Sequence, residues 1–325
     1  MLWIYILNLV IFVIFFFVLA RAGSWAVESL SRISQFLGWK EFVVSFILMA
    51  FTTSLPEFFV GISSALHGRP QLSFGNVIGS NVINLTLLVG VSALLAKGLK
   101  MERALVKRDA LYVALIGFLP VLLLLDKNLS RGDGIVLILF LFLYFFQLSS
   151  QKEAFTRVFS NSFQKDFTQL KQLLIEIVVF FVSVGALLLA ADGIVRSANF
   201  FAKGFDLSLL FVGIFIVAFG TNLPEFTFGI KSILLGHKEM VLGNLMGSVV
   251  VNSTLILGVT ALLSPIEVPS LSPFFLGIVF TFLSTLFFYI FSRTNEKISQ
   301  KEAIFLILFY ILFVLLEIFY GRFSF

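Results

Sequence analysis

Residues 50–68 read AFTTSLPEFFVGISSALHG, and residues 218–236 read AFGTNLPEFTFGIKSILLG. At a constant offset of 168 positions, residues 50–95 and 218–263 are identical at 25 of 46 positions without a gap. The identities include Pro, Glu, Asn, Gly and Ser, which two unrelated apolar segments would not share by chance. The sequence therefore contains an internal repeat, which indicates an architecture of two similar halves.

The composition around the repeat is that of a membrane protein. Of the 325 residues, 59% are hydrophobic and only 13% are charged, the mean hydropathy is +1.05, and 43 residues are Phe. A soluble domain has about 25% charged residues. This composition excludes cytosolic enzymes, nucleic-acid-binding proteins and secreted scaffolds. The absence of Cys excludes disulfides and thiolate metal sites, and the two histidines, His67 and His237, are predicted to be surface residues.

Ten segments are apolar and long enough to be membrane-spanning candidates. They are residues 2–20, 41–66, 72–96, 109–125, 134–150, 170–191, 207–234, 240–264, 272–292 and 303–320. The repeat offset carries the first segment onto the sixth, which favours a span over a cleaved signal peptide for residues 2–20. Each half then has five spans. Because five is an odd number, the second half enters the membrane from the opposite side and has the inverted orientation. The sequence predicts an all-α polytopic membrane protein of ten transmembrane helices, arranged as two inverted five-helix repeats.

The same pattern predicts the domain boundaries and the orientation. The first repeat covers residues 1–150, a short polar cytoplasmic linker covers residues 151–169, and the second repeat covers residues 170–325. Loops that follow odd-numbered spans carry 17 of the 23 Lys and Arg residues. Since positively charged loops stay in the cytoplasm, both termini are predicted to lie outside the cell membrane.

Glu57 and Glu225 are the central candidates for function. Each lies well inside an apolar segment, where a carboxylate is costly and marks a functional site by default. Each follows a proline, Pro56 or Pro224, which disrupts the helix and frees backbone carbonyls. Carbonyl and carboxylate oxygens are hard ligands that suit Na⁺ or Ca²⁺.

Other oxygen-bearing side chains recur at helical spacing around the two glutamates. Residues four apart share a helix face, and the pairs are Thr53 with Glu57, Thr221 with Glu225, Ser80 with Asn84, and Ser248 with Asn252. Gly75 and Gly79, with their counterparts Gly243 and Gly247, have small-xxx-small spacing and predict close helix contacts.

The duplicated T-S-L-P-E and G-N-x-x-G-S-N-x-x-N pattern resembles the two α-repeats of the sodium/calcium exchanger family. The resemblance implies antiport of Ca²⁺ against Na⁺ by alternating access in a lipid bilayer. An enzymatic activity is disfavoured because the sequence contains no nucleophile–base or metal-hydrolase constellation, and no cofactor or nucleic-acid partner is expected. The resemblance also implies that spans one and six slide across a core of the other eight. The ligand set that it implies comprises Glu57 and Glu225, the side chains of Thr53, Ser54, Ser80, Asn84, Thr221, Asn222, Ser248 and Asn252, and the backbone carbonyls of Ala50 and Ala218.

The sequence departs from the family pattern at three positions. Thr52 stands where Gly is usual, Asn222 where Ser is usual, and Val249 where the first Asn of the second copy is expected. Asn occupies both position 84 and position 252, so the site has a charge of about −2 from its two glutamates, and the choice of ions and the stoichiometry stay open. A Ca²⁺/H⁺ antiporter is the nearest alternative function, and a passive cation channel is a further one.

Overall fold

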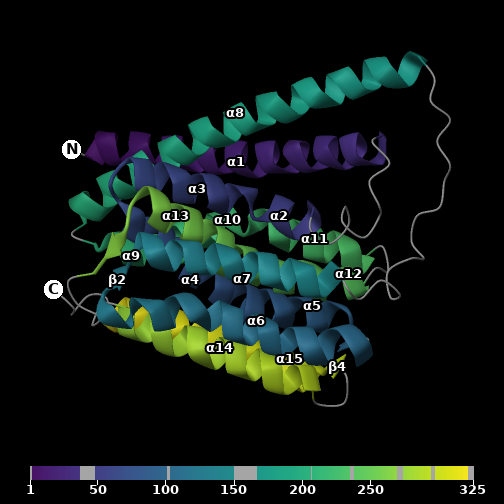
Figure 1. Ribbon diagram of the computed structural model, residues 1–325. Helices are drawn as coiled ribbons and strands as arrows, with labels where there is room; N and C mark the ends of the chain where they lie inside the picture. The colour runs from purple at the N-terminus through teal and green to yellow at the C-terminus, as the bar shows by residue number, and fades with distance from the viewer. Residues whose placement is uncertain are drawn as a thin grey trace.

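The computed structural model describes residues 2–36, 48–100, 103–149, 167–205, 207–234, 238–268, 274–293 and 297–320. These residues form a bundle of roughly aligned helices (Figure 1). The first half contains α1 (Leu2–Phe36), α2 (Leu48–Thr53), α3 (Leu55–Leu66), α4 (Pro70–Val82), η2 (Ile83–Leu88), α5 (Val89–Leu95), β1 (Leu99–Lys100), α6 (Arg103–Leu123), η3 (Leu124–Asp126), β2 (Asn128–Leu129) and α7 (Arg131–Ser149). The second half contains α8 (Phe167–Gly204), α9 (Leu209–Phe211), η4 (Val212–Val217), α10 (Ala218–Thr221), α11 (Leu223–Leu234), α12 (Lys238–Val251), η5 (Asn252–Ile256), α13 (Leu257–Leu263), β3 (Ile266–Glu267), α14 (Phe275–Arg293), β4 (Lys297–Ile298) and α15 (Gln300–Tyr320).

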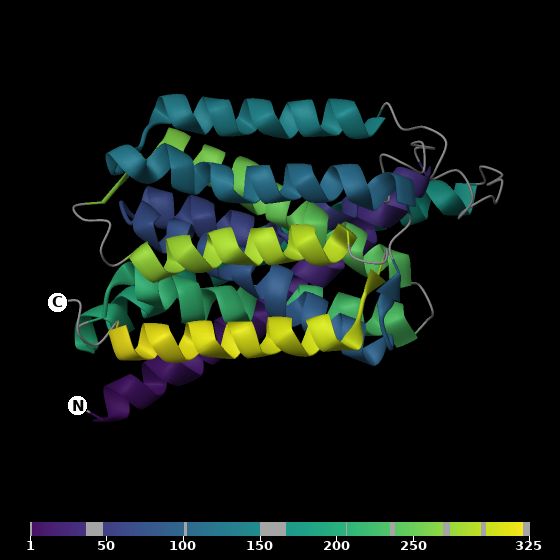
Figure 2. The ribbon, with the colours of Figure 1, turned by 90° about the horizontal axis from the view of Figure 1, so that it is seen from below.

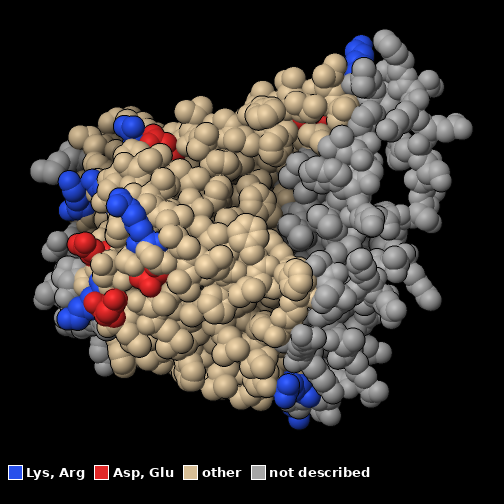
Figure 3. All heavy atoms as spheres, in the orientation of Figure 1, with Lys and Arg blue, Asp and Glu red and all other residues tan. Residues whose placement is uncertain are grey.

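The helices have the length and composition of membrane spans. Seven segments of the described residues are long and apolar enough to cross a membrane, and they are Trp3–Ala26, Pro70–Leu95, Lys171–Gly204, Leu209–Leu234, Val241–Leu263, Phe275–Arg293 and Gln300–Phe319. Leu55–Leu66 and Ala110–Asp126 are shorter apolar helices. On the face shown in Figure 3, charged side chains lie toward the ends of the bundle, and a broad surface without charge lies between them. The predicted polytopic membrane fold is confirmed.

The first helix is longer than its apolar segment predicts. The segment 2–20 continues as helix to Phe36, because its last part is amphipathic and contains no Pro. Arg21, Trp25, Glu28 and Arg32 are exposed on one face, while Ala22, Ala26 and Ser29 are buried on another. The predicted segment 170–191 is likewise longer, since α8 extends from Phe167 to Gly204.

Helices α1 and α8, the first helices of the two repeats, lie side by side along one edge of the bundle (Figure 1). Apolar side chains of both helices, including Leu19 and Ile194, share a buried cluster with α3. Arg32 of α1 also donates a 2.6 Å hydrogen bond to Glu176 of α8. The two helices are therefore joined to each other by both apolar and ionic contacts.

Two helices are interrupted just before their Pro-Glu sequences. Between α2 and α3 the chain turns at Ser54, and between α10 and α11 it turns at Asn222. Pro56 and Pro224 have no N–H with which to continue the helical ladder, so each begins a new helix instead. The interruptions place Glu57 and Glu225 in the first turns of α3 and α11.

Segments of π-helix interrupt other spans. Asn84 lies in η2, between α4 and α5, and Asn252 begins η5, between α12 and α13. A third π-helical segment, η4, leads into the interruption at Asn222. The wider turn of a π-helix is common at functional sites, where it changes the direction in which a side chain points.

The two repeats interlock in an inverted arrangement. Helix α4 packs against η4, and its counterpart α12 packs against α2. Strand β1 pairs antiparallel with β4, and β2 pairs antiparallel with β3, so each two-stranded sheet joins one repeat to the other. The start of α1 and the end of α15 lie at one end of the bundle, called here the termini end (Figures 1 and 2). The end where α7 stops and α8 starts is called the linker end, after the predicted linker, of which residues 151–166 lie outside the described residues.

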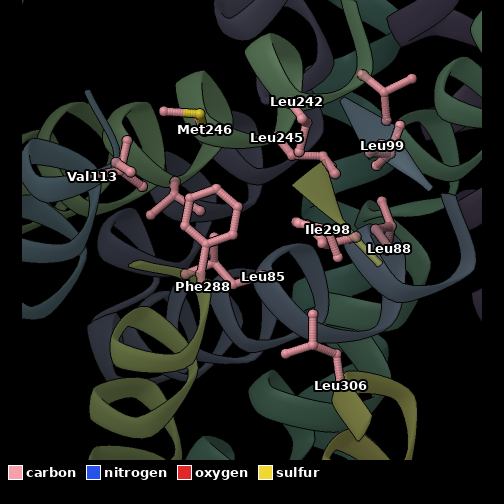
Figure 4. Packing of buried hydrophobic residues seen from close by; sticks show 14 of the residues in the cluster. Leu85, Leu88, Leu99, Val113, Leu242, Leu245, Met246, Phe288, Ile298 and Leu306 are labelled. Carbon is pink, nitrogen blue, oxygen red and sulfur yellow. The ribbon is translucent and has the colours of Figure 1, made fainter. Parts of the chain in front are cut away.

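Buried apolar side chains and close glycine contacts hold this arrangement. Phe288, Leu85, Leu245 and Leu306 belong to one cluster that joins helices of both repeats (Figure 4). A Cβ atom on Gly75 would lie 2.5 Å from the carbonyl oxygen of Leu210, and one on Gly79 would lie 2.3 Å from that of Ile214. The predicted close contact is therefore confirmed for this pair. By the repeat offset, the residues that would meet Gly243 and Gly247 lie among residues 41–47, outside the described part.

Candidate cation-binding site

Glu57 and Glu225 meet near the centre of the bundle. Both side chains have 0% exposed surface, and the two carboxylates are close enough to interact electrostatically. All four carboxylate oxygens are buried without a hydrogen-bond partner, and no ion pair involves either glutamate within the described residues. Two buried carboxylates in this condition have an uncompensated desolvation cost unless a positive charge joins them.

The threonines that precede the glutamates are held by asparagines of the opposite repeat. The Thr53 hydroxyl donates to Asn244 Oδ1 at 3.0 Å, and the Thr221 hydroxyl donates to Asn76 Oδ1 at 3.2 Å. These two bonds are equivalent under the repeat offset, and all four side chains are buried. Thr221 also lies near the Glu57 carboxylate, so the bond to Asn76 fixes a hydroxyl beside a candidate ligand.

Ser80 and Ser248 connect the helix interruptions to the following spans. Asn222 donates from Nδ2 to Ser80 Oγ at 2.7 Å, and Thr53 shares a 3.1 Å hydrogen bond with Ser248. The Asn222 side-chain oxygen remains without a partner, as does Ser54 Oγ at the equivalent position. At both interruptions, therefore, one buried oxygen is left available.

The two asparagines on π-helical segments also retain unused oxygens. Asn84 and Asn252 have 0% exposed surface, and the side-chain oxygen of each has no hydrogen-bond partner. Asn252 donates from Nδ2 to Asn81 Oδ1 at 3.4 Å, and Asn81 donates from its own Nδ2 to Ser253 at 2.8 Å. These bonds direct the amide nitrogen of Asn252 into a polar network and leave its oxygen as the free end.

The implied ligand set also includes the backbone carbonyls of Ala50 and Ala218, and that of Ala218 is already engaged in hydrogen bonds, unlike the free side-chain oxygens. The Ala218 carbonyl already accepts bonds from Asn222 N at 3.1 Å, Asn222 Nδ2 at 2.7 Å and the Thr221 hydroxyl at 3.3 Å. Ala50 lies in α2, one turn before the interruption. Thr52, one of the departures from the family pattern, is buried, and its hydroxyl has no partner.

The structure explains why Thr52 and Gly220, which are equivalent positions, differ. A Cβ atom on Gly220 would lie 2.0 Å from the ring of Phe16 on α1. A side chain at position 220 would therefore require the Phe16 ring to move, whereas position 52 holds the buried Thr52 side chain.

Several side chains that form hydrogen bonds within the candidate site were not predicted from the sequence. Asn76 and Asn244 support the threonines, and their identity in both copies of the repeat is a signal that could have found them. Asn81 and Ser253 have no such signal, because their counterparts are Val249 and Leu85. His67 is exposed as predicted, but it also contacts Asp192 of α8 at 3.1 Å, whereas His237 lies outside the described residues.

The arrangement can bind cations and offers little else chemically. It presents carboxylate, amide and hydroxyl oxygens, which are the ligands preferred by Na⁺ and Ca²⁺. It lies at the interface of two inverted repeats, between interrupted helices, in the middle of the membrane-spanning segments. Together, the fold and the site define a secondary transporter for cations.

Comparison with known proteins identifies the family. The family model for the sodium/calcium exchanger protein matches residues 7–149 and 175–319. The sodium/calcium exchanger MaX1 of Methanosarcina acetivorans is 28% identical over 91% of this chain and 94% of its own length. The inner membrane protein YrbG of Escherichia coli is 28% identical over 74% of this chain and 75% of its own. A solved structure of the sodium-calcium exchanger NCX_Mj superposes with a TM-score of 0.65 and 24% identity, covering 95% of this chain and 98% of that one. The chain belongs to the sodium/calcium exchanger family.

Proposed function

We propose that Glu57 and Glu225 together bind the cations that this transporter carries. The single observation that supports the assignment is the pair of fully buried carboxylates whose four oxygens have no hydrogen-bond partner. Their combined charge of −2, when both are ionised, equals in magnitude that of one Ca²⁺ or two Na⁺. A bound cation would thus offset the desolvation free energy of burying the two carboxylates together.

The neighbouring oxygens complete the proposed ligand set. The free side-chain oxygens of Ser54, Asn84, Asn222 and Asn252 belong to it, with the hydroxyls of Thr53, Thr221, Ser80 and Ser248. We include the backbone carbonyls of Ala50 and Ala218 as in the family pattern. Since the Ala218 carbonyl has three donors in this structure, its use by an ion requires that Asn222 or Thr221 turn away.

As a member of its family, the protein is a secondary antiporter and not an enzyme. It exchanges Ca²⁺ for Na⁺ across a membrane by alternating access, in which one site is exposed to each side in turn. The family match favours Na⁺ over H⁺ as the counter-ion.

We further propose the boundaries and the orientation of the repeats. The first repeat occupies residues 1–150, the linker residues 151–169, and the second repeat residues 170–325; the two separate matches of the family model support this division. The excess of Lys and Arg after odd-numbered spans supports a cytoplasmic linker and extracellular termini, in the cell membrane.

A flux assay in vesicles tests the proposed function directly. Purified protein is reconstituted with Ca²⁺ outside and with Na⁺, K⁺, Li⁺ or H⁺ gradients in turn, while the other gradients are clamped. We expect Ca²⁺ uptake with an outward Na⁺ gradient and none with an outward H⁺ gradient at equal Na⁺. Uptake that follows the pH gradient alone would contradict sodium exchange and support the Ca²⁺/H⁺ antiporter.

A further inference from the structure

An ion pair between His67 and Asp192 links α8 to α3, whose other contact with α8 is largely apolar. His67 follows the last residue of α3, and Asp192 lies on α8, where both helices approach the termini end (Figure 1). His67 Nε2 is 3.1 Å from Asp192 Oδ1, and the two side chains are 34% and 36% exposed, so protons in solution can reach them. Of the ion pairs among the described residues, this one alone joins α8 to a helix other than α1.

Both ring nitrogens of His67 face oxygen acceptors. Nδ1 is 2.8 Å from the Ser63 carbonyl oxygen, and Nε2 faces the Asp192 carboxylate. A neutral imidazole has one N–H and can donate to only one of these oxygens, so a nitrogen lone pair then faces the other. The imidazolium has two N–H groups and can donate to both. The geometry therefore fits the protonated ring better than the neutral one.

The charged groups around the ring are few. Arg196 donates from Nε to the second oxygen of Asp192 at 2.7 Å, which holds the carboxylate between two basic side chains. Of the elements packed against α3, only α1 and α8 carry charged side chains. Helix α1 has none before Arg21, and the remaining charges of α8 lie toward its two ends. Arg69 is the other charged residue of the turn that follows α3, and the C-terminal end of α3 itself favours a positive charge.

An ion pair restrains a sliding helix in a way that apolar packing does not. Apolar side chains of α3 and α8 share a buried cluster, and apolar contact is non-directional, so one apolar surface can replace another as a helix slides. A hydrogen bond depends steeply on distance and angle. Movement of α8 along α3 by a few ångströms therefore breaks the contact between His67 and Asp192. The pair Arg32–Glu176 joins α1 to α8 and is kept when these two helices move together.

We propose that His67 and Asp192 form a proton-controlled contact that holds α8 against the other eight spans in the conformation described above. Histidine ordinarily changes charge between pH 5 and 8. The contact is therefore strongest at acidic pH and weakens as the pH rises through this range. Acid on the termini side, which the proposed orientation places outside the cell, thus slows the departure of α8 from its present position. This inference rests on the proposed function, because the sliding of α8 is part of alternating access. His67 and Asp192 are positioning residues, since neither belongs to the proposed ion site.

The position of α8 can be measured without transport. The chain has no cysteine of its own, so Leu125→Cys in η3 and Leu174→Cys in α8 place one spin label on the eight-span core and one on the sliding helix. Both side chains are exposed. The distribution of distances between the labels is recorded by double electron–electron resonance in lipid nanodiscs at a fixed Na⁺ concentration, at about pH 5.5 and about pH 8.5. The quantity compared is the ratio of the population at the present distance to the population at any other.

Two substitutions of His67 should act at opposite ends of the pH range. His67→Gln can donate a hydrogen bond but cannot be protonated, so it should lower the ratio by about two- to fivefold at acidic pH and leave it unchanged at alkaline pH. His67→Arg is permanently charged, so it should raise the ratio by a similar factor at alkaline pH and leave it unchanged at acidic pH. Each variant is compared with the doubly labelled parent at the same pH, which cancels any titration of Glu57 and Glu225.

The outcomes separate the contact from the ion site. In an Asp192→Asn background, His67→Gln should have no further effect, and an effect that persists there overturns the assignment of Asp192 as the partner. Arg69→Gln is the control and should keep the pH response of the parent.

A ratio that is the same in the parent and in both His67 variants at each pH overturns the proposal, as does a single distance throughout. If His67→Arg does not fold, His67→Gln at acidic pH decides alone. A ratio that depends on His67 in a protein without Na⁺-driven Ca²⁺ flux supports the contact and contradicts the proposed function.

Discussion

At the scale of single residues, the proposed ion binding depends on the environment of Glu57 and Glu225. A buried carboxylate loses its hydration, and hydrogen bonds or positive charges have to replace it. Around these two glutamates, the nearby amides and hydroxyls instead bond to one another: Thr53 to Asn244, and Thr221 to Asn76. The polar network thus fixes the proposed ligands in place and leaves the carboxylate oxygens, which we propose to bind a cation, without a hydrogen-bond partner.

Replacing either glutamate should abolish exchange. Glu57→Gln and Glu225→Gln keep the shape but leave the bound cation with one carboxylate ligand instead of two. Breaking a buried pair of opposite charges costs about 3–5 kcal/mol, which corresponds to a loss of more than about 100-fold in ion affinity. The measurement is Na⁺-driven Ca²⁺ uptake in vesicles. Glu317→Gln, a change in another buried carboxylate on α15, is the control and should retain flux. Near-normal flux in both site variants would show that the site is misplaced.

The asparagines behind the threonines should tune affinity without abolishing transport. Asn76→Ala and Asn244→Ala remove the acceptors of the Thr221 and Thr53 hydroxyls, so each should raise the Ca²⁺ concentration for half-maximal flux by about two- to tenfold. The pair Asn76→Ala with Thr221→Val should be no worse than the poorer single variant, because both remove the same bond. Fully additive effects of the two changes would contradict the coupling seen in the structure.

At the scale of helices, close glycine contacts decide how α4 meets the interrupted span of the other repeat. Gly75 and Gly79 face the carbonyls of Leu210 and Ile214, and Gly213 in turn faces the carbonyl of Leu72. The backbones can approach only because these positions have no side chain. The same contact brings Ser80 within reach of Asn222, so the glycines also position two residues of the proposed ion site.

Adding a single methyl group at this contact should destabilise the protein. In Gly79→Ala, the new Cβ would lie 2.3 Å from a backbone oxygen that cannot turn away, and overpacking of this kind costs about 1–3 kcal/mol. The expected result is a lower melting temperature in detergent. Gly185→Ala in α8 is the matched control, because nothing lies within 4 Å of its Cβ position, and it should melt at or above the temperature of the unmodified protein. Equal melting of the two variants would contradict the proposed role of Gly79.

Much of this architecture could be predicted from the sequence, because the residues that impose it, such as the prolines and the spaced glycines, occur in both copies of the repeat. Pro56 and Pro224 predict the interruptions at Ser54 and Asn222, and the small-xxx-small spacing predicts the contact at Gly79. The π-helical segments around Asn84 and Asn252 could not be predicted, since they depend on packing between repeats and have no local signal. The extension of α1 to Phe36 was not predicted, because the length of an apolar segment indicates only the part of a helix that lies in the hydrocarbon core. The helix continues beyond that core as an amphipathic segment.

At the scale of the whole molecule, the two repeats are joined by β-strand pairing at both ends of the bundle. Strands β2 and β3 pair at the termini end and β1 and β4 at the linker end, each pair joining one repeat to the other. Lys238 of the second repeat also donates to the Ala96 carbonyl of the first at 2.9 Å. These contacts tie together the core helices, while α1 and α8 pack mainly on each other along one edge.

The orientation of this assembly can be tested by labelling. Because 17 of 23 Lys and Arg residues follow odd-numbered spans, a cysteine introduced near residue 160 should face the cytoplasm. An impermeant thiol reagent should therefore leave it unlabelled in intact cells and label it after permeabilisation. A cysteine at Asn128, placed by β2 at the termini end, is the opposite control and should be labelled in intact cells. Labelling of position 160 in intact cells would overturn the orientation.

The net charge moved in each cycle is the remaining property of the whole molecule. Glu57 and Glu225 together supply −2, so bound Ca²⁺ or two Na⁺ leaves the site neutral, and three Na⁺ leave it at +1. The free amide oxygens of Asn84, Asn222 and Asn252 can stabilise that extra positive charge as dipoles. We therefore expect exchange of three Na⁺ for one Ca²⁺, which carries one net charge and responds to voltage by about 2.3 kcal/mol per 100 mV. The measurement is Na⁺-driven Ca²⁺ flux in vesicles with the membrane potential clamped at several values. A rate and a final Ca²⁺ gradient that do not depend on voltage would contradict this stoichiometry and support electroneutral exchange of two Na⁺ for one Ca²⁺.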